Sequence, residues 1–502
     1  MLSGARIKLF STDNSYIVLI SLKFLVRKPI LAQATSTDMS THPGFRSLQS
    51  EIDNEELTFQ GTVPAWLEGT LIRNGPGLFD IDGTRVSHWF DGLAMLRRYK
   101  FIDGNISYSN RFLRTDAHAD AAEGRLTGQF GTDTRGWRRL IEPLRSGLPT
   151  PTDNANVHVA QIDQEYVALT EAPRRVSFDL DTLQTQDEFE FADDLTEHLT
   201  AAHLVDDQRQ RELVGFATQF GRVPKYHVYR IPYGSRTRER LTSVEARGPA
   251  YMHDCSVTDE HIVLVEVPLI ISVLQALNPF TEGIQDLFSW EPERGMRLLV
   301  IRRDTGELVA DPVVDSAFVF HHINAYLDNN TVVLDLVEYA DNRVLDAMQM
   351  QQLDTITSNP APDGTPVRYR INTTDESVER VSLGEVGMEL PRIAQADVSG
   401  RHRYTYAQLT HRDGGNGLVK LDCDTGETRE WWEAGVYLEE PVPIRHPEAT
   451  EDDDGVVIAP ALDTEQDQTD LLLFDASTLD IQARAPLPHS EPFGFHGRFF
   501  ST

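Results

Sequence analysis

Four histidines stand in sequence settings that suit metal chemistry. They are His203 in Leu-Thr-Ala-Ala-His, His253 in Tyr-Met-His-Asp-Cys, His321 in Phe-Val-Phe-His-His-Ile-Asn and His496 in Phe-Gly-Phe-His-Gly. Neutral imidazole is a good ligand for iron, copper, zinc and nickel. Because nearly 300 residues separate the first from the last, only a fold that gathers distant strand ends could use them together. Four imidazoles without a thiolate would leave Fe(II) its full charge and open positions for dioxygen.

The elements that would position these histidines are predicted to be β-strands. Short runs rich in β-branched and aromatic residues recur along the chain, and turns rich in Gly, Asp, Asn and Pro separate them. This spacing indicates an all-β array. The runs include Ile106–Leu113, Glu165–Thr170, Glu212–Ala217, His261–Val267, Thr331–Val337 and Gly455–Ile458.

A repeated phrase supports a propeller. Apolar residues, then Asp, then Thr with Leu or Gly occur in residues 176–183, 299–306, 418–426 and 472–479. A strand, a tight turn and a returning strand, repeated in this way, are typical of propeller blades, although the repeats alone do not count the blades. Because a propeller directs the inner strand of every blade at one axis, it would let remote histidines converge.

Charge is the unusual part of the composition. The chain has 502 residues, 78 acidic and 46 basic, for a net charge of −32, and only six of the basic residues are lysines. A dense anionic surface argues against nucleic-acid binding, because phosphates need basic patches. The composition fits an ordinary acidic protein, but the scarcity of lysine favours adaptation to molar salt and a halophilic, archaeal source.

The chain offers no disulfide framework. Cys255 and Cys423 are its only cysteines, which favours a reducing cytoplasm. No sequence feature predicts a protein partner.

Residues 1–38 differ from the rest. They carry a net charge of +3, against −35 for the remainder. The apolar stretch Ser15–Val26 is interrupted by Lys23 and is too short to span a bilayer. A signal peptide is one interpretation, because Leu31-Ala-Gln-Ala34 resembles a cleavage site. We favour a start-site error, so that residues 1–38 form a non-native or disordered extension and 39–502 form a single domain.

Several sequence words resemble the carotenoid cleavage oxygenase family, which includes the animal β-carotene oxygenases and the retinoid isomerohydrolase. The resemblance runs from about Leu57 to Phe500 and is closest in wording to the animal branch. In addition to the histidine words, it rests on Gly69–Gly77, Trp89–Gly92, Thr152–His158, Ala168–Glu171, Glu389–Ile393, Glu440-Pro441 and His446–Val457.

The resemblance implies a fold and a metal site. The fold would be a seven-bladed β-propeller with a cap of loops and short helices over the iron axis. The Fe(II) ligands would be His203, His253, His321 and His496. The spacing to Asn324 selects His321 over His322, and His158 is taken as structural.

The resemblance also assigns residues around the ligands. Three carboxylates, Glu171, Glu389 and Glu440, would hold the second nitrogens of ligand histidines, since such partners fix the tautomer and the ring orientation. Glu440 is chosen over Glu439 because it directly precedes Pro441. Thr170 matches a residue near the open iron position of relatives.

One apolar stretch, Val267–Phe280, has two interpretations. It could be a buried helix that packs over the propeller. It could instead form an apolar rim at a substrate tunnel that dips into a membrane surface, because carotenoids are almost insoluble in water. The rim residues would be Leu269, Ile270, Ile271, Val273, Leu274, Leu277 and Phe280.

We therefore expect a non-haem Fe(II) dioxygenase that cleaves a carotenoid double bond with O2 to two carbonyl products, with β-carotene to retinal as the favoured reaction. It would be cytoplasmic, with a peripheral membrane contact as a further expectation. An off-centre or apocarotenoid-cleaving enzyme, a stilbene-cleaving oxygenase, a retinoid isomerase and a non-enzymatic scaffold are alternatives. The absence of lysine from Ile106–Leu140 counts against the stilbene-cleaving class, which uses one.

The net charge predicts a dependence on salt. Raising KCl from about 0.1 M to about 1 M shortens the Debye length from about 10 Å to about 3 Å and screens the repulsion among surface carboxylates. The melting temperature, followed by circular dichroism, should therefore rise steeply. A melting temperature that stays constant across this range would contradict the halophilic interpretation.

Overall fold

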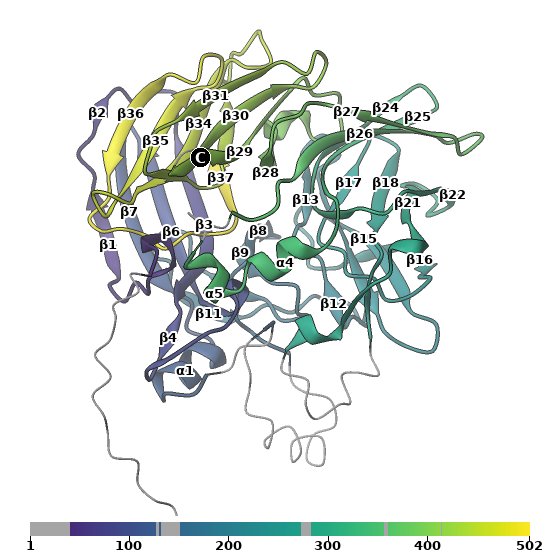
Figure 1. Cartoon of the computed structure of the whole chain (residues 1–502), viewed down its shortest axis with the longest axis horizontal. Helices are drawn as coiled ribbons and strands as arrows, with labels where there is room; N and C mark the ends of the chain where they lie inside the picture. The colour runs from purple at the N-terminus through teal and green to yellow at the C-terminus, as the bar shows by residue number, and fades with distance from the viewer. Residues whose placement is uncertain are drawn as a thin grey trace, which may run out of the picture. The chain divides into compact units, whose positions relative to one another are not determined.

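The computed structural model describes residues 41–126, 130–131, 151–272, 283–355, 360–412 and 414–501. Its regular structure is almost entirely β, arranged as seven antiparallel sheets of four to six strands and two small hairpins. The sheets are the blades of a seven-bladed β-propeller (Figure 1). The predicted fold class is confirmed, and the sheets supply the blade number that the repeated phrase could not.

The first four blades follow the order of the chain, apart from the last strand of blade 1. Blade 1 contains β1 (Ile52–Glu56), β7 (Asn105–Phe112), β6 (Leu93–Ile102), β3 (Gly69–Leu78) and β37 (Gly497–Ser501). Blade 2 contains β8 (His158–Ile162), β9 (Glu165–Leu169), β10 (Val176–Phe178) and β11 (Thr185–Glu188). Blade 3 contains β12 (Leu199–Thr200), β13 (Val205–Asp207), β14 (Glu212–Gln219), β15 (Lys225–Pro232) and β16 (Glu239–Glu245). Blade 4 contains β17 (Cys255–Val257), β18 (His261–Glu266), β21 (Met296–Arg302), β22 (Leu308–Ala310) and β23 (Val313–Val314).

The other three blades continue in the same way. Blade 5 contains β24 (Phe318–Asp328), β25 (Thr331–Tyr339), β26 (Thr365–Asn372) and β27 (Val378–Ser382). Blade 6 contains β28 (Met388–Arg392), β29 (Tyr404–Arg412), β30 (Gly415–Asp422) and β31 (Thr428–Trp432). Blade 7 contains β32 (Val436–Leu438), β33 (Val442–Arg445), β34 (Gly455–Asp463), β35 (Gln468–Asp475), β36 (Ile481–Pro486) and β2 (Gln60–Gly61).

Two strand pairings join the ends of the propeller domain. The last strand, β37, pairs with β3 from Gly69 opposite Ser501 to Arg73 opposite Gly497, and β2 adds to the outer edge of blade 7. The purple and yellow strands therefore lie side by side in Figure 1. Because both ends are bound into neighbouring sheets, the ring of blades is closed by hydrogen bonds and not by the order of the chain.

The repeated phrase forms the same turn in four blades. It joins β10 to β11, β21 to β22, β30 to β31 and β35 to β36. In blade 2 the Asp179 carboxylate accepts the backbone N–H and the hydroxyl of Thr182, and Leu183 adopts a left-handed φ of 55°. In blade 6 Gly426 takes the left-handed position with φ of 77°. Short acidic side chains and glycine suit these positions, because they cap turn N–H groups and tolerate positive φ.

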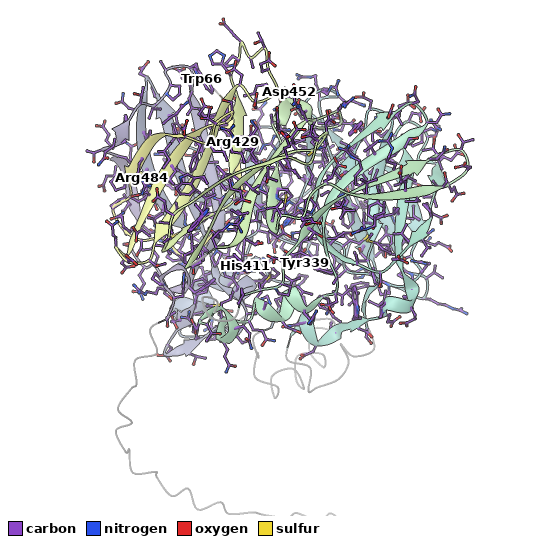
Figure 2. All side chains as sticks on the ribbon, turned by 45° about the horizontal axis from the view of Figure 1, so that its top comes forward. Trp66, Tyr339, His411, Arg429, Asp452 and Arg484 are labelled. Atoms are coloured by element: carbon purple, nitrogen blue, oxygen red, sulfur yellow. The ribbon has the colours of Figure 1, made fainter. Side chains whose placement is uncertain are left out.

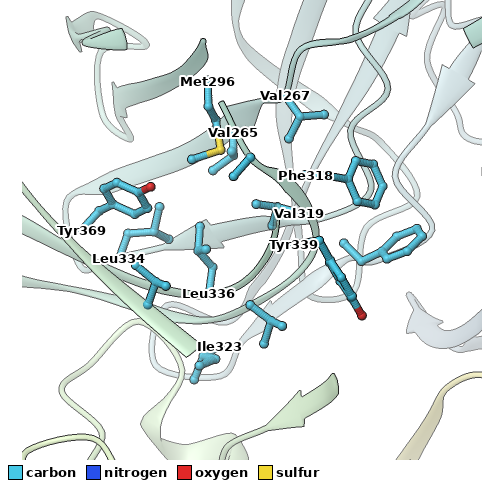
Figure 3. Close-up of a cluster of buried hydrophobic side chains, with 14 of the residues drawn as sticks. Val265, Val267, Met296, Phe318, Val319, Ile323, Leu334, Leu336, Tyr339 and Tyr369 are labelled. Atoms are coloured by element: carbon cyan, nitrogen blue, oxygen red, sulfur yellow. The ribbon is translucent and has the colours of Figure 1, made fainter. Parts of the chain in front are cut away.

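Burial falls from the inner to the outer strands. All residues of β18 and all but two of β24 are buried, whereas β27 and β31 are mostly exposed. Inner strands are sandwiched between neighbouring blades, so both of their faces need apolar residues. Figure 3 shows one such interface, where Val265 of β18 and Leu334 of β25 share an apolar cluster.

The outer strands carry much of the charge. Arg484 of β36 binds the Glu433 carboxylate at 2.8 Å, and Arg429 of β31 donates to the Thr478 carbonyl at 3.2 Å (Figure 2). A partly exposed ion pair such as Arg484–Glu433 contributes little to stability and weakens with salt.

Helices are few and short among the described residues. The α-helices are α1 (Asp116–Ala122), α4 (Arg343–Ala347) and α5 (Met350–Leu353). The 3-10 turns are η1 (Pro43–Phe45), η2 (Trp89–Asp91), η4 (Ile284–Leu287), η5 (Pro292–Arg294) and η6 (Gln395–Asp397). Because α4 and α5 follow the end of β25, they lie at the end of blade 5 where β24 begins. Within the described ranges, no helix is long and apolar enough to cross a membrane.

The apolar stretch differs from both interpretations of the sequence where it is described. Leu269–Ile271 form a short strand, β19, which pairs with β20 (Phe288–Trp290) and not with a blade. Leu269 and Ile271 are buried in the large apolar core, and Ile270 is half-buried. Leu269 and Ile271 therefore do not form an exposed membrane rim, because their side chains already have apolar partners. Val273, Leu274, Leu277 and Phe280 lie outside the described residues.

A buried carboxylate connects blades 1 and 7. Glu491 accepts hydrogen bonds from the hydroxyls of Tyr99, at 2.7 Å, and Tyr108, and its Oε1 lies 3.3 Å from Nε of Arg97. All four side chains are buried. Glu491 lies between β36 of blade 7 and β37 of blade 1, and its backbone N–H donates to Thr469 of β35. The cluster therefore supports the segment that leads into the closing strand.

We expect Glu491→Ala to lower the free energy of unfolding by about 3–5 kcal/mol, because it leaves the Arg97 charge buried and unpaired. The matched control is Asp181→Ala, which removes the exposed partner of Lys100 and should cost at most about 1 kcal/mol. Urea unfolding followed by tryptophan fluorescence measures both. Equal losses in the two variants would refute the role of the buried cluster.

Candidate metal centre

The four histidines come from four different blades. His203 lies between β12 and β13 of blade 3, and His253 directly precedes β17 of blade 4. His321 is on β24 of blade 5, and His496 directly precedes β37 of blade 1. His321 lies on an edge strand and the other three lie next to edge strands, and these edge strands contact strands of neighbouring blades. The fold thus brings together residues that are up to 293 positions apart.

The nitrogens of the four rings converge. One ligand atom from each histidine lies within 4.8 Å of all the others. The Nε2 atoms of His203 and His253 are 3.0 Å apart, and those of His321 and His496 are 3.3 Å apart. The set contains no thiolate and no carboxylate. Four imidazole nitrogens at one point suit a divalent transition metal and add no negative charge to it.

Three of the rings are held by carboxylates. Nδ1 of His253 lies 2.6 Å from Glu171, Nδ1 of His321 lies 2.7 Å from Glu389, and Nδ1 of His496 lies 2.8 Å from Glu440. A carboxylate can only accept, so each Nδ1 carries the proton and each Nε2 presents its lone pair. This arrangement fits a metal ion, because with Nδ1 facing a carboxylate each ring directs Nε2 at the point where a metal would bind.

At two places the sequence offered adjacent candidates, His321 or His322 as a ligand and Glu439 or Glu440 as a carboxylate partner. His322 points elsewhere, with Nδ1 at 2.9 Å from the Ser256 hydroxyl, and burial lowers the pKa of His322 to about 4. Glu439 accepts hydrogen bonds from Arg73 and from the Gly494 N–H, at 2.8 and 3.0 Å, and contacts no histidine of the cluster. The site is therefore built from His321 and Glu440, while their neighbours serve the surrounding structure.

Glu440 has the strongest set of partners. It lies 2.9 Å from Nη1 of Arg73 and 3.1 Å from Nη1 of Arg392, and it accepts the Gly497 N–H at 2.7 Å. Burial opposes its ionisation, but Arg392, His496 and Arg73 outweigh burial and hold the pKa of Glu440 well below its usual range. For His496 burial prevails over Glu440 and lowers its pKa to about 4, which favours a neutral imidazole.

Glu171 and Glu389 are each bound by a neutral donor. The hydroxyl of Tyr251 donates to Glu171 at 2.9 Å, and that of Tyr339 donates to Glu389 at 2.9 Å. For both tyrosines, burial and the adjacent carboxylate raise the pKa well above 10, so the hydroxyls stay protonated donors. Against the cost of burial, His321 holds the pKa of Glu389 below its usual range.

His203 differs from the other three. In the described part of the chain no carboxylate contacts it, and its ring packs against His496 at 4.3 Å and His158 at 5.2 Å. Burial and the surrounding histidines hold the pKa of His203 well below its usual value. His158 accepts the Val159 N–H on Nδ1 at 2.7 Å and lies outside the converging set, which agrees with a structural role. Thr170 directly follows β9 as a buried residue beside Glu171, and its role near the metal stays a prediction.

An aromatic wall adjoins the cluster. The Phe320 ring meets His253 edge-on at 5.4 Å and packs against Phe318 at 4.7 Å. Tyr251 stacks parallel to Phe318 with ring centroids 6.4 Å apart. Such a wall excludes water and offers polarisable π-faces to an apolar, conjugated ligand.

Four residues around the cluster were not predicted from the sequence: Arg73, Arg392, Tyr251 and Tyr339. Weak signals were available for three of them. Arg73 and Arg392 lie in the words Gly69–Gly77 and Glu389–Ile393, and Tyr251 stands two residues before His253. Tyr339 stands 50 residues before Glu389, and no local pattern connects the two.

A second group of metal-ligand atoms lies between blades 5 and 6. Single atoms of Asp335, His402 and Cys423 lie within 4.8 Å of one another, and all three residues are buried. Arg368 already occupies both oxygens of Asp335, at 2.8 and 2.7 Å, and Nδ1 of His402 faces the Asn324 amide at 3.1 Å. Because the guanidinium compensates the carboxylate, this group is interpreted as an ion pair within blade 5, against which His402 packs with Nε2 at 3.2 Å from Asp335, and not as a metal site.

Known proteins share this architecture and much of this sequence. The model of the retinal pigment epithelial membrane protein family matches residues 45–501. Carotenoid cleavage dioxygenase 8 of Arabidopsis thaliana is 32% identical, covering 91% of this chain and 85% of that protein. The carotenoid isomerooxygenase of Galleria mellonella is 30% identical over 90% and 95% of the two chains. The β,β-carotene 15,15'-dioxygenase of Gallus gallus is 26% identical over 88% and 94%.

A solved structure supports the same architecture. A variant of the Synechocystis apocarotenoid oxygenase has a TM-score of 0.82 at 23% identity, covering 92% of this chain and 98% of that one. At this identity the likeness shows the fold. The match to the family model over nearly the whole chain, together with the curated relatives, decides the classification: the chain belongs to the carotenoid cleavage dioxygenase family and is an enzyme of that class.

Proposed function

We propose that this protein is an Fe(II)-dependent dioxygenase that cleaves one double bond of a carotenoid, with β-carotene cut centrally to retinal as the favoured reaction. The observation that carries the proposal is the convergence of the imidazole nitrogens of His203, His253, His321 and His496, three of them backed by carboxylates. Iron, when bound there, supplies the binding and activation of dioxygen.

The side chains of the protein prepare this chemistry. Glu171, Glu389 and Glu440 accept hydrogen bonds from Nδ1–H of their histidines and so keep the Nε2 lone pairs available. Phe318 and Phe320 keep the region beside the cluster apolar and hold water away from it. In the net reaction one C=C bond and one O2 molecule become two C=O groups, so no external reductant and no net proton are needed.

The choice of substrate rests on the relatives and on substrate physics. The relative from Gallus gallus is named for central cleavage of β,β-carotene, and the Synechocystis neighbour is named for apocarotenoids. Retinal would serve light-driven pumps of a halophilic archaeon, which the charge of −32 and the six lysines favour. Because a carotenoid is nearly insoluble in water, the substrate would be taken up from a membrane surface. The protein itself would be cytoplasmic.

The substrate is tested by product analysis. We expect the protein, loaded anaerobically with Fe(II) and then given β-carotene in micelles and O2, to release retinal, identified by chromatography and mass spectrometry. Long apocarotenals as the sole products would move the cut off centre. No turnover of any carotenoid by iron-loaded protein would overturn the proposal.

The ligand assignment is tested by adjacent histidines. His321→Ala should abolish stoichiometric iron and activity, because it removes a converging nitrogen, whereas His322→Ala should retain iron because that side chain binds Ser256. Metal content is measured by mass spectrometry after desalting, with circular dichroism to check folding. Loss of iron from the His322 variant, with retention in the His321 variant, would contradict the assignment.

A further inference from the structure

The carboxylate of Glu389 is held at both of its oxygens. Its Oε2 accepts from Nδ1 of His321, at 2.7 Å, and from the Leu390 N–H, while Oε1 accepts the Tyr339 hydroxyl at 2.9 Å. Glu171 differs, because Tyr251 and His253 bind the same oxygen, Oε1. A carboxylate bound at only one oxygen can turn, whereas one bound at both has a fixed plane.

Tyr339 is placed so that its hydroxyl contacts Glu389. It is the last residue of β25 and is buried opposite Phe318. Its ring packs against Phe318 and Phe320 at 6.3 and 6.2 Å, as a phenylalanine would. Figure 3 shows its hydroxyl pointing away from the apolar side chains. In the described part of the chain, the recorded hydrogen bond of this hydroxyl is the one to Glu389.

Building on the proposed function, we propose that Tyr339 is a positioning residue of the metal centre. Its hydroxyl keeps Oε1 of Glu389 occupied, so Oε2 stays on Nδ1 of His321 and the imidazole keeps one orientation and one tautomer. Without that donor, Oε1 would be a buried carboxylate oxygen without a partner, which is costly enough to favour rotation of the group. Loss of the Tyr339 hydroxyl would therefore alter metal binding through the orientation of His321, and not through a contact with the substrate.

The same blade offers a matched control. Tyr369 on β26 is buried at the edge of the same apolar cluster, as Figure 3 shows, and its hydroxyl donates to Glu338. Glu338 also binds Arg380 and contacts none of the four histidines. Each substitution, Tyr339→Phe or Tyr369→Phe, therefore removes one tyrosine hydroxyl that binds a glutamate of the propeller. Only in Tyr339→Phe does that glutamate in turn bind a histidine of the cluster, His321.

The test uses Co(II) as the probe in the full-length protein. We expect Tyr339→Phe to raise the Kd for Co(II), measured by chelator competition, roughly tenfold, the lower range for loss of a partner behind a metal ligand. The visible absorption bands of bound Co(II) should shift as well. Tyr369→Phe should keep the parent Kd and spectrum, while circular dichroism reports how far each variant loses thermal stability.

Three outcomes would count against this inference. Parent-like Kd and spectrum in Tyr339→Phe would overturn the positioning role, as would equal changes in both variants. Failure of the parent protein to bind Co(II) would overturn the proposed metal centre, and the inference with it. If both variants lost melting temperature to the same extent and their Co(II) spectra did not differ, the change would be a general defect of folding.

Discussion

The pairing of β37 with β3 is the constraint on which the site depends. His496 directly precedes β37, and Glu440, its partner, lies in blade 7 next to it. If the last strand left blade 1, one imidazole would leave the cluster and the ring would lose its hydrogen-bonded closure. The metal centre and the closure of the fold therefore use the same short segment, and ring formation is a precondition for a complete site.

Buried ion pairs tie the site to that closure. Arg73 of β3 reaches both Glu439 and Glu440, so a residue of blade 1 holds the carboxylate that holds His496. Burying a charge is costly. Once two opposite charges are buried as a pair, removing one of them destabilises the protein, because the other is left buried and unpaired. Here the cost is offset by geometry, because Glu440 also accepts from Arg392 and from the Gly497 N–H. Arg303 forms a similar buried junction between blades 4 and 3, with Asp207 and Glu212.

The three carboxylates around the site are electrically different. Glu440 faces two guanidinium groups, whereas Glu171 and Glu389 face tyrosine hydroxyls. A carboxylate already neutralised by arginine is a weaker acceptor, so it polarises its imidazole less. The net charge of −32 acts differently, because exposed carboxylates are screened by salt while these buried groups are screened much less.

The sequence by itself determined the class of fold, the repeated strand–turn–strand units and the family. Strand runs and Asp-containing turns are local patterns, so they can be found without knowledge of the rest of the chain. The four histidine words and three glutamate words were found through the family resemblance, and the structure places those residues in one cluster.

Only the tertiary structure decided which other side chains support that cluster. Arg73 meets Glu440 across 367 positions, and Tyr339 meets Glu389 across 50. For Leu269 and Ile271 the sequence left burial over the propeller and exposure at a membrane rim open, and the structure places both side chains in the core. The hydrophobicity of a residue indicates that its side chain avoids water, but it does not indicate whether the protein core or a membrane shields that side chain. Contacts between blades are set by ring closure, and no local pattern of residues encodes them.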